Sequence, residues 1–501
     1  MTAHGAEVVV VGSGFAGTLC ARELLEAGHE VLLIERGALR PDADGLPHHE
    51  READLPTTVH TDETAPGTPE YPWKYGFGVG GSSLLWACVA PRLLPSDFEL
   101  RTRYGVGLDW PVNYDELQPY FEEGERLLRV AGRADENLPR RGPFPAEAPE
   151  PSKVDRLIGP FLEPWGVLPQ ARPPGSDAGY PPALGGFDLG FSLLGVLGSA
   201  PFDGGGFRLL ERTVAVRLRC RAGRVQRVEC VDAGGRRVEV AAGTVVLAAN
   251  GIENPALLLR SGLDGPHVGR WLFDHSHVLL ELRLDSDPGH GRAPARDTSV
   301  SYAWADGPWR SERASMVVMP YNPGLQIREA LALALADGSN GRGLRERLRE
   351  RYARALMLDV CGEDLPRRER FVELSPRRGA LGLPLNRVSY PPDSDYFERG
   401  VSAVLAGLEE RLRPLGARVV ARGHGARGAH LLGTCRMGAE GVVDENLRHH
   451  DFENLYVAGG SAFPSYSALH PTVTIAALGV RLGRHLAEHV LPGAAANVKA
   501  S

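Results

Sequence analysis

The sequence predicts an α/β fold, α+β overall, in which one domain is assembled from separate parts of the chain. Continuous apolar runs occur near the start at Val8–Val11 and Val31–Ile34, in the middle at 244–249, and near the end at 455–458. Runs of this kind, without polar alternation, are typical of parallel strands that are covered on both faces. Because they lie so far apart in the sequence, we expect a discontinuous domain.

The first two strands flank a glycine-rich turn and an amphipathic helix. Gly12-Ser-Gly14-Phe-Ala-Gly17 follows the first strand, and Glu35 follows the second. The glycines allow a tight turn and let the backbone approach a pyrophosphate at the helix N-terminus, while the acid accepts hydrogen bonds from a ribose. This Rossmann-like βαβ unit predicts a dinucleotide site, but the motif does not separate NAD from FAD.

Size and composition exclude several classes of function. The chain has 501 residues, 43% of them hydrophobic, and a net charge of −7. A chain of this length predicts more than one domain, and the acidic balance argues against nucleic-acid binding. The sequence enters a strand directly and contains no long apolar stretch, so we expect a cytoplasmic protein without a membrane span. The six cysteines lack the spacing of a metal site or a disulfide framework, so no metal is predicted.

The remaining patterns divide the chain into two domains. Val214 to Val246 alternates like a β-meander with a turn at Asp232-Ala-Gly-Gly235, whereas residues 40–70 are polar and predict a loop or lid. The nucleotide-binding elements assign 1–134, 206–276 and 429–501 to the cofactor domain. The other segments, 135–205 and 277–428, form a second domain that would cover the cofactor.

Two histidines near the C-terminus are candidates for acid–base chemistry. His430 begins the stretch His-Leu-Leu-Gly-Thr-Cys-Arg-Met-Gly, and His470 precedes Pro471-Thr472. A proline at the first helical position predicts that His470 is the N-cap, facing the positive end of the helix dipole. That field disfavours imidazolium, so His470 would stay neutral and able to take a proton from an alcohol. The pair Asp274-His275, which is distant from both in the sequence, is interpreted as a structural hydrogen-bonding element at a domain junction.

Further motifs follow one another in chain order and carry a family resemblance. They are Gly80-Gly81-Ser-Ser-Leu-Leu-Trp86, Ala90-Pro-Arg92 to Phe98, Asp109-Trp-Pro111, Gly251-Ile-Glu-Asn-Pro255 to Gly262, Val268 to His275, and Asn454 to Gly460. With the glycine-rich turn and the two histidine segments, the chain resembles the glucose–methanol–choline (GMC) oxidoreductases over nearly its whole length. It is closest in style to the sugar-oxidising branch that includes pyranose oxidases and gluconate dehydrogenases. The resemblance implies FAD, a Rossmann-like flavin domain, and a substrate domain with an antiparallel sheet.

The resemblance also implies roles for individual residues. His430 matches the family's active-site histidine, and His470 matches the partner position, which is histidine in some members and asparagine in others. The implied cofactor-binding residues are Gly12, Gly14, Gly17 and Glu35 at the adenosine diphosphate, Gly80, Gly81 and Ser83 under the flavin, Val214 at the adenine, and Gly459, Gly460, Pro471 and Thr472 around the flavin ring.

One departure from the family concerns the flavin linkage. Many sugar-oxidising relatives carry, shortly after the Gly-Gly-x-Ser segment, a histidine that bonds covalently to the flavin. This chain has Leu84-Leu85-Trp86 there, so we expect non-covalent FAD.

The implied activity is oxidation of a CH–OH group in a polyhydroxylated small molecule, namely a sugar, glycoside, aminosugar or cyclitol. A histidine would take the hydroxyl proton, and hydride would pass to flavin N5 and then to oxygen or another acceptor. Which histidine is the main base stays open, with a preference for His430. The alternatives are a redox-silent FAD-containing lyase of the hydroxynitrile lyase type and an NAD-dependent dehydrogenase.

Overall fold

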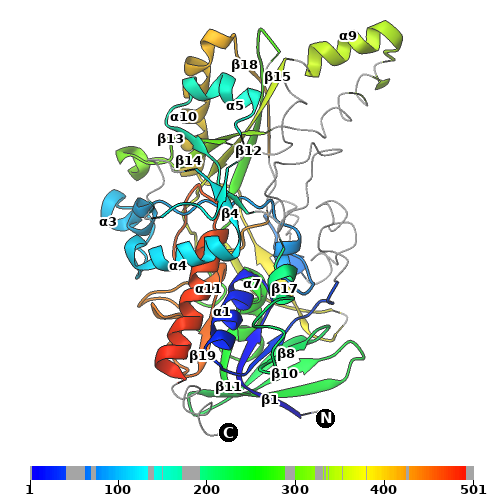
Figure 1. The fold of residues 1–501 in the computed structure, drawn as a ribbon, viewed down its shortest axis with the longest axis vertical. Helices are drawn as coiled ribbons and strands as arrows, with labels where there is room; N and C mark the ends of the chain where they lie inside the picture. The colour runs from blue at the N-terminus through cyan, green and yellow to red at the C-terminus, as the bar shows by residue number, and fades with distance from the viewer. Residues whose placement is uncertain are drawn as a thin grey trace.

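The computed structural model describes residues 3–40, 62–68, 75–133, 140, 142–148, 150–171, 192–287, 299–321, 331, 335–336, 338–352, 354–379, 381–424 and 428–491. Two large sheets dominate them, one in the lower and one in the upper half of Figure 1.

The lower sheet has seven strands drawn from separate parts of the chain. Its order is β8 (Phe207–Leu210), β2 (Val31–Ile34), β1 (Ala3–Val11), β11 (Arg237–Leu247), β10 (Arg224–Val231) and β9 (Val214–Arg221), with β19 (Leu455–Val457) also paired to β11. The pairs β1–β2, β1–β11, β2–β8 and β11–β19 are parallel, and Val8 to Val10 are wholly buried. The predicted Rossmann-like, discontinuous sheet is therefore confirmed, as is the meander formed by β9, β10 and β11.

Several helices pack against this sheet. The helices α1 (Phe15–Glu26) and α11 (Thr472–His485) pack against each other, and α4 (Tyr114–Leu127) packs on α11, on the near side of the sheet in Figure 1. The helix α7 (Asn250–Arg260) follows β11. Both α1 and α11 begin at the edge of the lower sheet that faces the upper sheet, so their N-termini lie between the two sheets.

The upper sheet has six strands, and all of its pairs are antiparallel. Its order is β18 (Arg418–His424), β12 (Ser276–Arg283), β15 (Ala355–Gly362), β14 (Met316–Tyr321), β13 (Ser299–Trp304) and β6 (Trp165–Val167). One face packs Val278, Leu280 and Val360 against α10 (Asp395–Arg411) and α5 (Lys153–Ile158). Because side chains alternate along a strand, His277, Asp359 and Cys361 lie on the opposite face. The predicted antiparallel sheet is confirmed.

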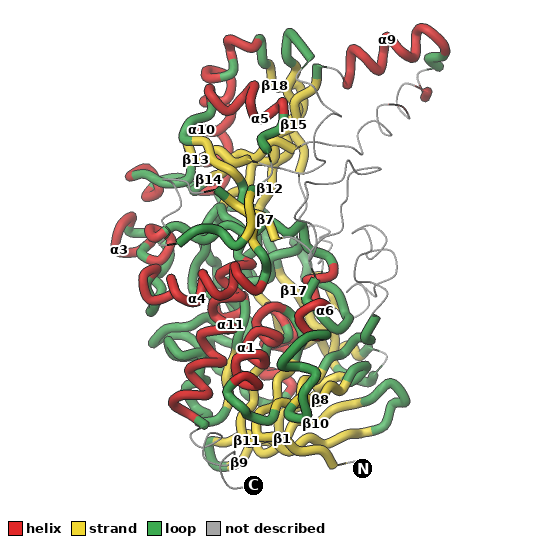
Figure 2. The backbone as a smooth tube through the Cα atoms, in the orientation of Figure 1, coloured by secondary structure: helices red, strands yellow, loops and turns green. Residues whose placement is uncertain are grey.

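Smaller elements complete the described fold. A three-stranded sheet joins β16 (Phe371–Arg378), β17 (Pro384–Ser389) and β3 (Asp62–Thr64), and another joins β5 (Ala146–Glu147), β4 (Val130–Gly132) and β7 (Gln170–Ala171). The short helices are α3 (Leu100–Tyr104) and α6 (Leu194–Leu197), and α9 (Gly341–Tyr352) stands away from the body in Figure 2. The expectation of a loop over 40–70 is wrong at β3, where backbone pairing with β17 makes a strand of a polar segment. Residues 41–61 and 69–70 of that loop lie outside the described residues.

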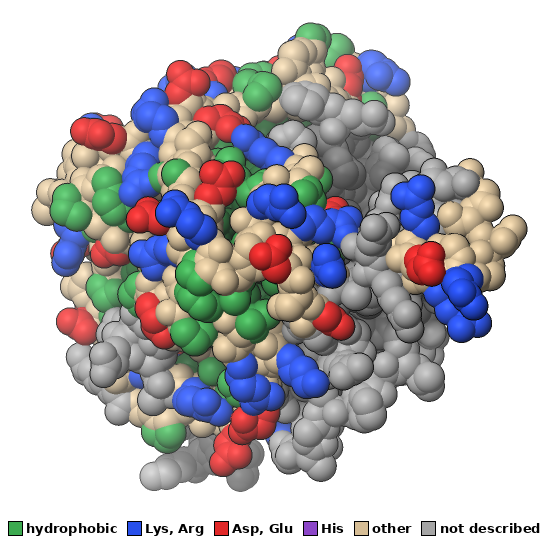
Figure 3. Space-filling view, turned by 90° about the horizontal axis from the view of Figure 1, so that it is seen from above, with side chains coloured by type: hydrophobic (Ala, Val, Ile, Leu, Met, Phe, Trp, Pro, Cys, Tyr) green, Lys and Arg blue, Asp and Glu red, His purple; other side chains and the backbone are tan. Residues whose placement is uncertain are grey.

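The surface seen from above in Figure 3 intersperses acidic and basic side chains rather than gathering one sign of charge. Among the residues that the structure describes, no helix combines the length and apolarity needed to span a bilayer.

Candidate active site

A cavity of about 460 Å³ lies between the two large sheets. Ligand pockets typically fall within about 300–1,000 Å³, so this one can hold a small organic molecule or part of a larger one. At one end it is lined by Gly12, Gly14, Glu35 and Val214, and at the other by His430, His470 and Thr472. The cavity therefore joins the predicted nucleotide site to the predicted acid–base site.

Glu35 is held in place at the nucleotide end by Ser13 and Gly37. The Ser13 hydroxyl and backbone N–H donate to Oε2 at 2.6 and 3.1 Å, and the Gly37 N–H donates to Oε1 at 2.8 Å. Burial raises the pKa of Glu35, and these hydrogen bonds oppose that rise. The motif indicated the acid but gave no reason to notice Ser13, whose hydroxyl also accepts from the Gly80 N–H at 2.9 Å.

The glycines serve two different purposes. A Cβ on Gly17 would stand 2.0 Å from the Gly12 carbonyl oxygen, so Gly17 permits the close contact between α1 and the preceding turn. A Cβ on Gly14 would meet no protein atom within 4 Å, and Gly14 lines the cavity. Gly81 has φ +55°, and its Cβ would come within 3.0 Å of the Gly14 Cα. The two predicted glycine-rich segments thus form one cradle.

Some of the remaining predicted cofactor residues line the cavity, and the others do not. Gly459 and Gly460 line it, whereas Ser83 supports the loop beneath by donating to the Gly80 carbonyl at 2.7 Å and accepting from the Leu193 N–H at 3.0 Å. Gly17, Gly80 and Pro471 also lie outside the lining.

Two helix N-termini open toward the cavity. Neither the N-cap Gly14 of α1 nor the N-cap Pro471 of α11 supplies a side-chain cap, and Phe15 and Thr472 both line the cavity. Uncapped first-turn N–H groups and the positive end of the dipole favour negative charge. The prediction that His470 is the N-cap is wrong by one residue. Pro471 takes the N-cap position, with φ −82° and ψ −7°, and its carbonyl accepts the first helical bond from the Ile475 N–H at 2.9 Å.

The two predicted histidines lie together at the other end of the cavity. The ring centroids of His430 and His470 are 5.2 Å apart. His275 completes a triangle, with its ring 4.7 Å from His430 and 5.2 Å from His470. The side chain of Asp274 fixes the loop that carries His430, accepting from the His430 backbone N–H at 2.8 Å and from the Gly428 N–H. The interpretation of Asp274-His275 as a hydrogen-bonding element therefore omitted its closeness to His430.

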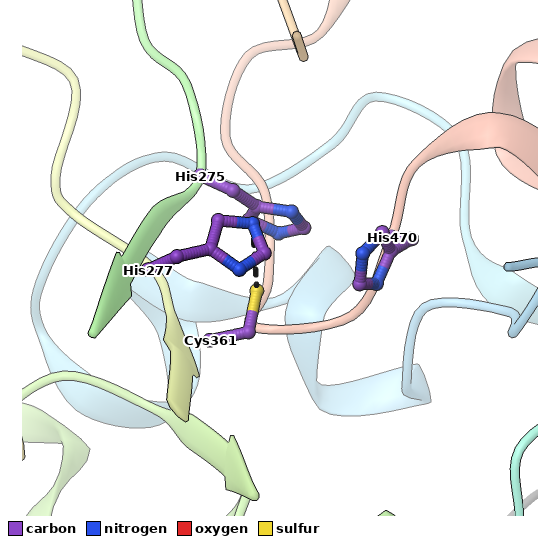
Figure 4. Close-up of side chains that lie close together, drawn as sticks. All are labelled: His275, His277, Cys361 and His470. Carbon is purple, nitrogen blue, oxygen red and sulfur yellow. Dashed lines mark hydrogen bonds between the residues drawn. The ribbon is translucent and has the colours of Figure 1, made fainter. Parts of the chain in front are cut away.

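A fourth histidine, His277, was missed by the sequence analysis. It points from β12 toward Cys361 of β15, its cross-strand partner, as Figure 4 shows. Its Nδ1 lies 3.0 and 3.1 Å from the two carboxylate oxygens of Asp359, and its Nε2 lies 3.7 Å from the Cys361 Sγ. Burial lowers the pKa of His277, but the charge of Asp359 outweighs burial and raises it well above its ordinary value. The pair is therefore an ion pair at neutral pH.

The other three histidines are neutral at pH 7. Burial, together with the charge of His277, lowers the pKa of His430 to about 3. Burial and the neighbouring histidines lower the pKa values of His275 and His470 well below the ordinary range. The prediction that His470 is neutral agrees with this, but the main cause is desolvation rather than the helix dipole. A neutral imidazole has one unprotonated ring nitrogen, so each of the two cavity histidines can accept a proton.

His275, His277, Cys361 and His470 also place one potential metal-ligating atom each within 4.8 Å of one another. Sequence spacing could not reveal this group, because it depends on the pairing of β12 with β15. Hydrogen bonds already engage both nitrogens of His275, and Asp359 and Cys361 engage those of His277. We therefore interpret the group as a hydrogen-bonded network, and the expectation of no metal stays a prediction.

Comparison with known families agrees with this architecture. Models of the GMC oxidoreductases match residues 200–277 and 408–479, and a model of an NAD(P)-binding Rossmann-like domain matches residues 10–40. The chain belongs to the GMC oxidoreductases. The matched segments contain β9 to β11 and both cavity histidines, so the predicted family is confirmed.

Known proteins are similar over nearly the whole chain. The fructose dehydrogenase large subunit of Gluconobacter japonicus is 29% identical, with 95% of this chain and 96% of that protein covered. The 6'''-hydroxyparomomycin C oxidase of Streptomyces lividus is 29% identical, with 98% and 93% covered. In fold, the chain is similar to pyridoxine 4-oxidase from Mesorbium loti, with TM-score 0.66, 22% identity, and 97% and 99% of the two chains covered.

The cavity fits the cofactor of this family. FAD is an elongated dinucleotide, and the cavity has a glycine cradle and an uncapped helix at its pyrophosphate end and a buried carboxylate where a ribose would lie. The GMC oxidoreductase described here is thus an FAD-dependent enzyme, as the family resemblance implied. Gly12, Gly14, Glu35 and Val214 would hold the adenosine diphosphate part, and Gly81, Gly459, Gly460 and Thr472 the flavin.

Proposed function

We propose that the enzyme oxidises a CH–OH group of a polyhydroxylated small molecule, namely a sugar, glycoside, aminosugar or cyclitol. The observation that carries the proposal is a pair of neutral histidines, the half-buried His430 and the buried His470, lining the cavity beside the N-terminus of α11. Two relatives are named for related chemistry, the fructose dehydrogenase and a paromamine 6'-oxidase of Streptomyces fradiae that is 29% identical. Both names denote polyhydroxylated substrates, which supports this substrate class.

The histidines supply the proton transfer. A carbon–hydrogen bond becomes a good hydride donor once the adjacent hydroxyl proton is lost or shared, and general-base assistance contributes about 10²–10⁴-fold. His430 takes this proton and His470 donates a hydrogen bond that orients the substrate oxygen. FAD, when bound in this cavity, supplies the hydride acceptor, N5 of the flavin.

The rest of the cavity supports this step. The first turn of α11 directs its uncapped N–H groups and positive dipole end toward the space that Thr472 and Gly460 line. Preorganised donors of this kind stabilise negative charge that develops during a reaction. Leu85 and Trp86 line the same cavity and offer no nucleophile, so the flavin is bound non-covalently. Oxygen or another acceptor then takes the electrons.

Anaerobic mixing of the purified yellow protein with a panel of sugars, aminosugars, cyclitols and simple alcohols tests this function. At least one polyhydroxylated compound should bleach the flavin within seconds. His430→Ala should lower the rate of flavin reduction about 10²–10⁴-fold, and His470→Ala by a smaller factor, with FAD content unchanged. If both variants reduced the flavin at near-normal rates, the assignment of the base would be wrong. If no compound bleached the flavin while a cyanohydrin was cleaved, the enzyme would be a redox-silent lyase.

A further inference from the structure

The hydrogen bonds of His275 specify where its proton lies. Its Nε2 is 2.7 Å from the backbone carbonyl oxygen of Ser467. A carbonyl oxygen can only accept a hydrogen bond, so Nε2 of His275 carries a hydrogen. His275 is also about 1% exposed and lies among three other imidazoles, one of them the ion-paired His277. A second positive charge is disfavoured in that setting, so the ring is neutral and its Nδ1 carries a lone pair.

The ring nitrogen of His430 that carries hydrogen follows from the tautomer of His275. The Nδ1 atoms of the two rings are 3.0 Å apart. Two lone pairs at this distance would repel, and a hydrogen bond needs one donor. Because Nδ1 of His275 is an acceptor, Nδ1 of His430 is the donor. A neutral imidazole carries one N–H, so Nε2 of His430 has the lone pair.

We propose that His275 is a positioning residue that holds His430 in its Nδ1–H tautomer and thereby makes Nε2 of His430 the atom that takes the substrate proton. The inference rests on the proposed function and deepens it, since it chooses between the two cavity histidines and names the reacting atom. In the proton-transfer step, the O–H bond of the alcohol breaks and an N–H bond forms at Nε2 of His430. The Nδ1–H of His430 keeps its acceptor throughout, so the imidazolium is stabilised without rearrangement.

His470 differs from His430 in its hydrogen bonding. Among the described residues, its buried Nδ1 has no hydrogen-bond partner. No hydrogen bond at Nδ1 therefore selects its tautomer as His275 does for His430, although His470 lines the same cavity. A hydrogen bond at Nδ1 thus orients the ring of His430, whereas Nδ1 of His470 has no such bond among the described residues. Among the described residues, the titratable groups beside the three rings include His277 and its partner Asp359, the thiol of Cys361, and Tyr466, whose ring lies 4.8 Å from that of His275.

Two substitutions at residue 275 separate this role from simple packing. His275→Asn keeps an amide oxygen near the position of Nδ1, so it can still accept from His430 although it no longer reaches Ser467. His275→Leu has a similar volume but removes the acceptor and leaves the Nδ1–H of His430 unpaired. We expect flavin reduction by the fastest compound of the panel to fall about 10²–10⁴-fold in His275→Leu and less than about tenfold in His275→Asn. FAD content and near-ultraviolet circular dichroism serve as the check that both variants fold.

Nitrogen NMR of the holoenzyme labelled with ¹⁵N-histidine reads the tautomers without any substrate. We expect His430 as Nδ1–H and His275 as Nε2–H in the wild type, His430 unchanged in His275→Asn, and His430 as Nε2–H in His275→Leu. An Nε2–H tautomer of His430 in the wild type, or a His275→Leu variant with unchanged tautomer and rate, would overturn the inference. So would stoichiometric zinc whose removal by a chelator shifts the nitrogen signals of His275. Failure of every compound to bleach the flavin would instead refute the proposed function, since the NMR result does not depend on turnover.

Discussion

The His277–Asp359 ion pair provides a quantitative prediction, because it places a positive charge close to the proposed base. The ring centroids of His277 and His430 are 6.5 Å apart. At an effective dielectric constant of about 20, two unit charges at that distance interact by about 2.5 kcal/mol, or about 2 pKa units. In Asp359→Asn, burial is no longer opposed by the carboxylate, so His277 becomes neutral and the pKa of His430 rises. The negative charge of Asp359, which raises the pKa of His430, is lost as well, so 2 units is an upper limit. We expect the pKa of His430 to rise by about 1 to 2 units.

The assay is the pH dependence of anaerobic flavin reduction by a saturating substrate, from about pH 8 to about pH 4.5. In the wild type, His430 has a pKa of about 3, so the rate should stay flat across this range unless another group titrates. In Asp359→Asn, the rate of flavin reduction should begin to fall at the acid end of this pH range, because more of His430 is protonated there. Glu281→Gln is the matched control, because it removes the same charge from the adjacent strand β12 at a residue outside the cavity lining. An acid limb identical in wild type and Asp359→Asn would refute the electrostatic coupling.

Three further predictions concern the cofactor and stability. Gly14→Ala should weaken FAD binding with little loss of stability, because its Cβ meets no protein atom within 4 Å but enters the cavity. Gly17→Ala should weaken FAD binding and also lower the free energy of unfolding by about 1–3 kcal/mol through overpacking, because its Cβ would stand 2.0 Å from the Gly12 carbonyl oxygen. FAD titration by fluorescence quenching with urea unfolding separates the two, and equal loss of stability in both variants would contradict this division. Acid precipitation should release all of the flavin into the supernatant, and flavin retained in the pellet would disprove non-covalent binding. The folded pKa of His430 lies below the unfolded value of about 6.5, so the unfolded state binds more protons at pH values between the two. The free energy of unfolding therefore falls by up to about 1.4 kcal/mol per pH unit as the pH drops from 6.5. As the pH is lowered, the apparent melting temperature of His430→Gln should decline less steeply than that of the wild type.

The sequence predicted the nucleotide-binding half of the fold well because its signals are local. The buried runs at Val8–Val11 and Val31–Ile34 and the glycines between them form one continuous βαβ unit, so their pattern alone determines strand, turn and helix. The β-meander was equally visible from alternation and a glycine-rich turn. The loop predicted over 40–70 failed at β3 because backbone pairing with β17, more than 300 residues away, overrides the polar composition.

Only the part of the candidate site that stands in local sequence motifs could be predicted. His430 and His470 stand in recognisable segments, whereas His277 and Asp359 become neighbours only when β12 and β15 pair, which no local pattern specifies. His470 was placed at the N-cap from the preference of proline for the first helical position, but the backbone of Pro471 itself takes the cap. The neutrality of these histidines has burial as its main cause, and burial is a property of the folded core.

The role of His430 as the base is decided by anaerobic flavin reduction in the wild type and in His430→Ala. We expect a polyhydroxylated compound to bleach the wild-type flavin, and His430→Ala, with its full complement of FAD, to be slower by about 10²–10⁴-fold. A wild-type enzyme that holds FAD but is bleached by no alcohol, or a His430→Ala variant as fast as the wild type, would contradict this expectation.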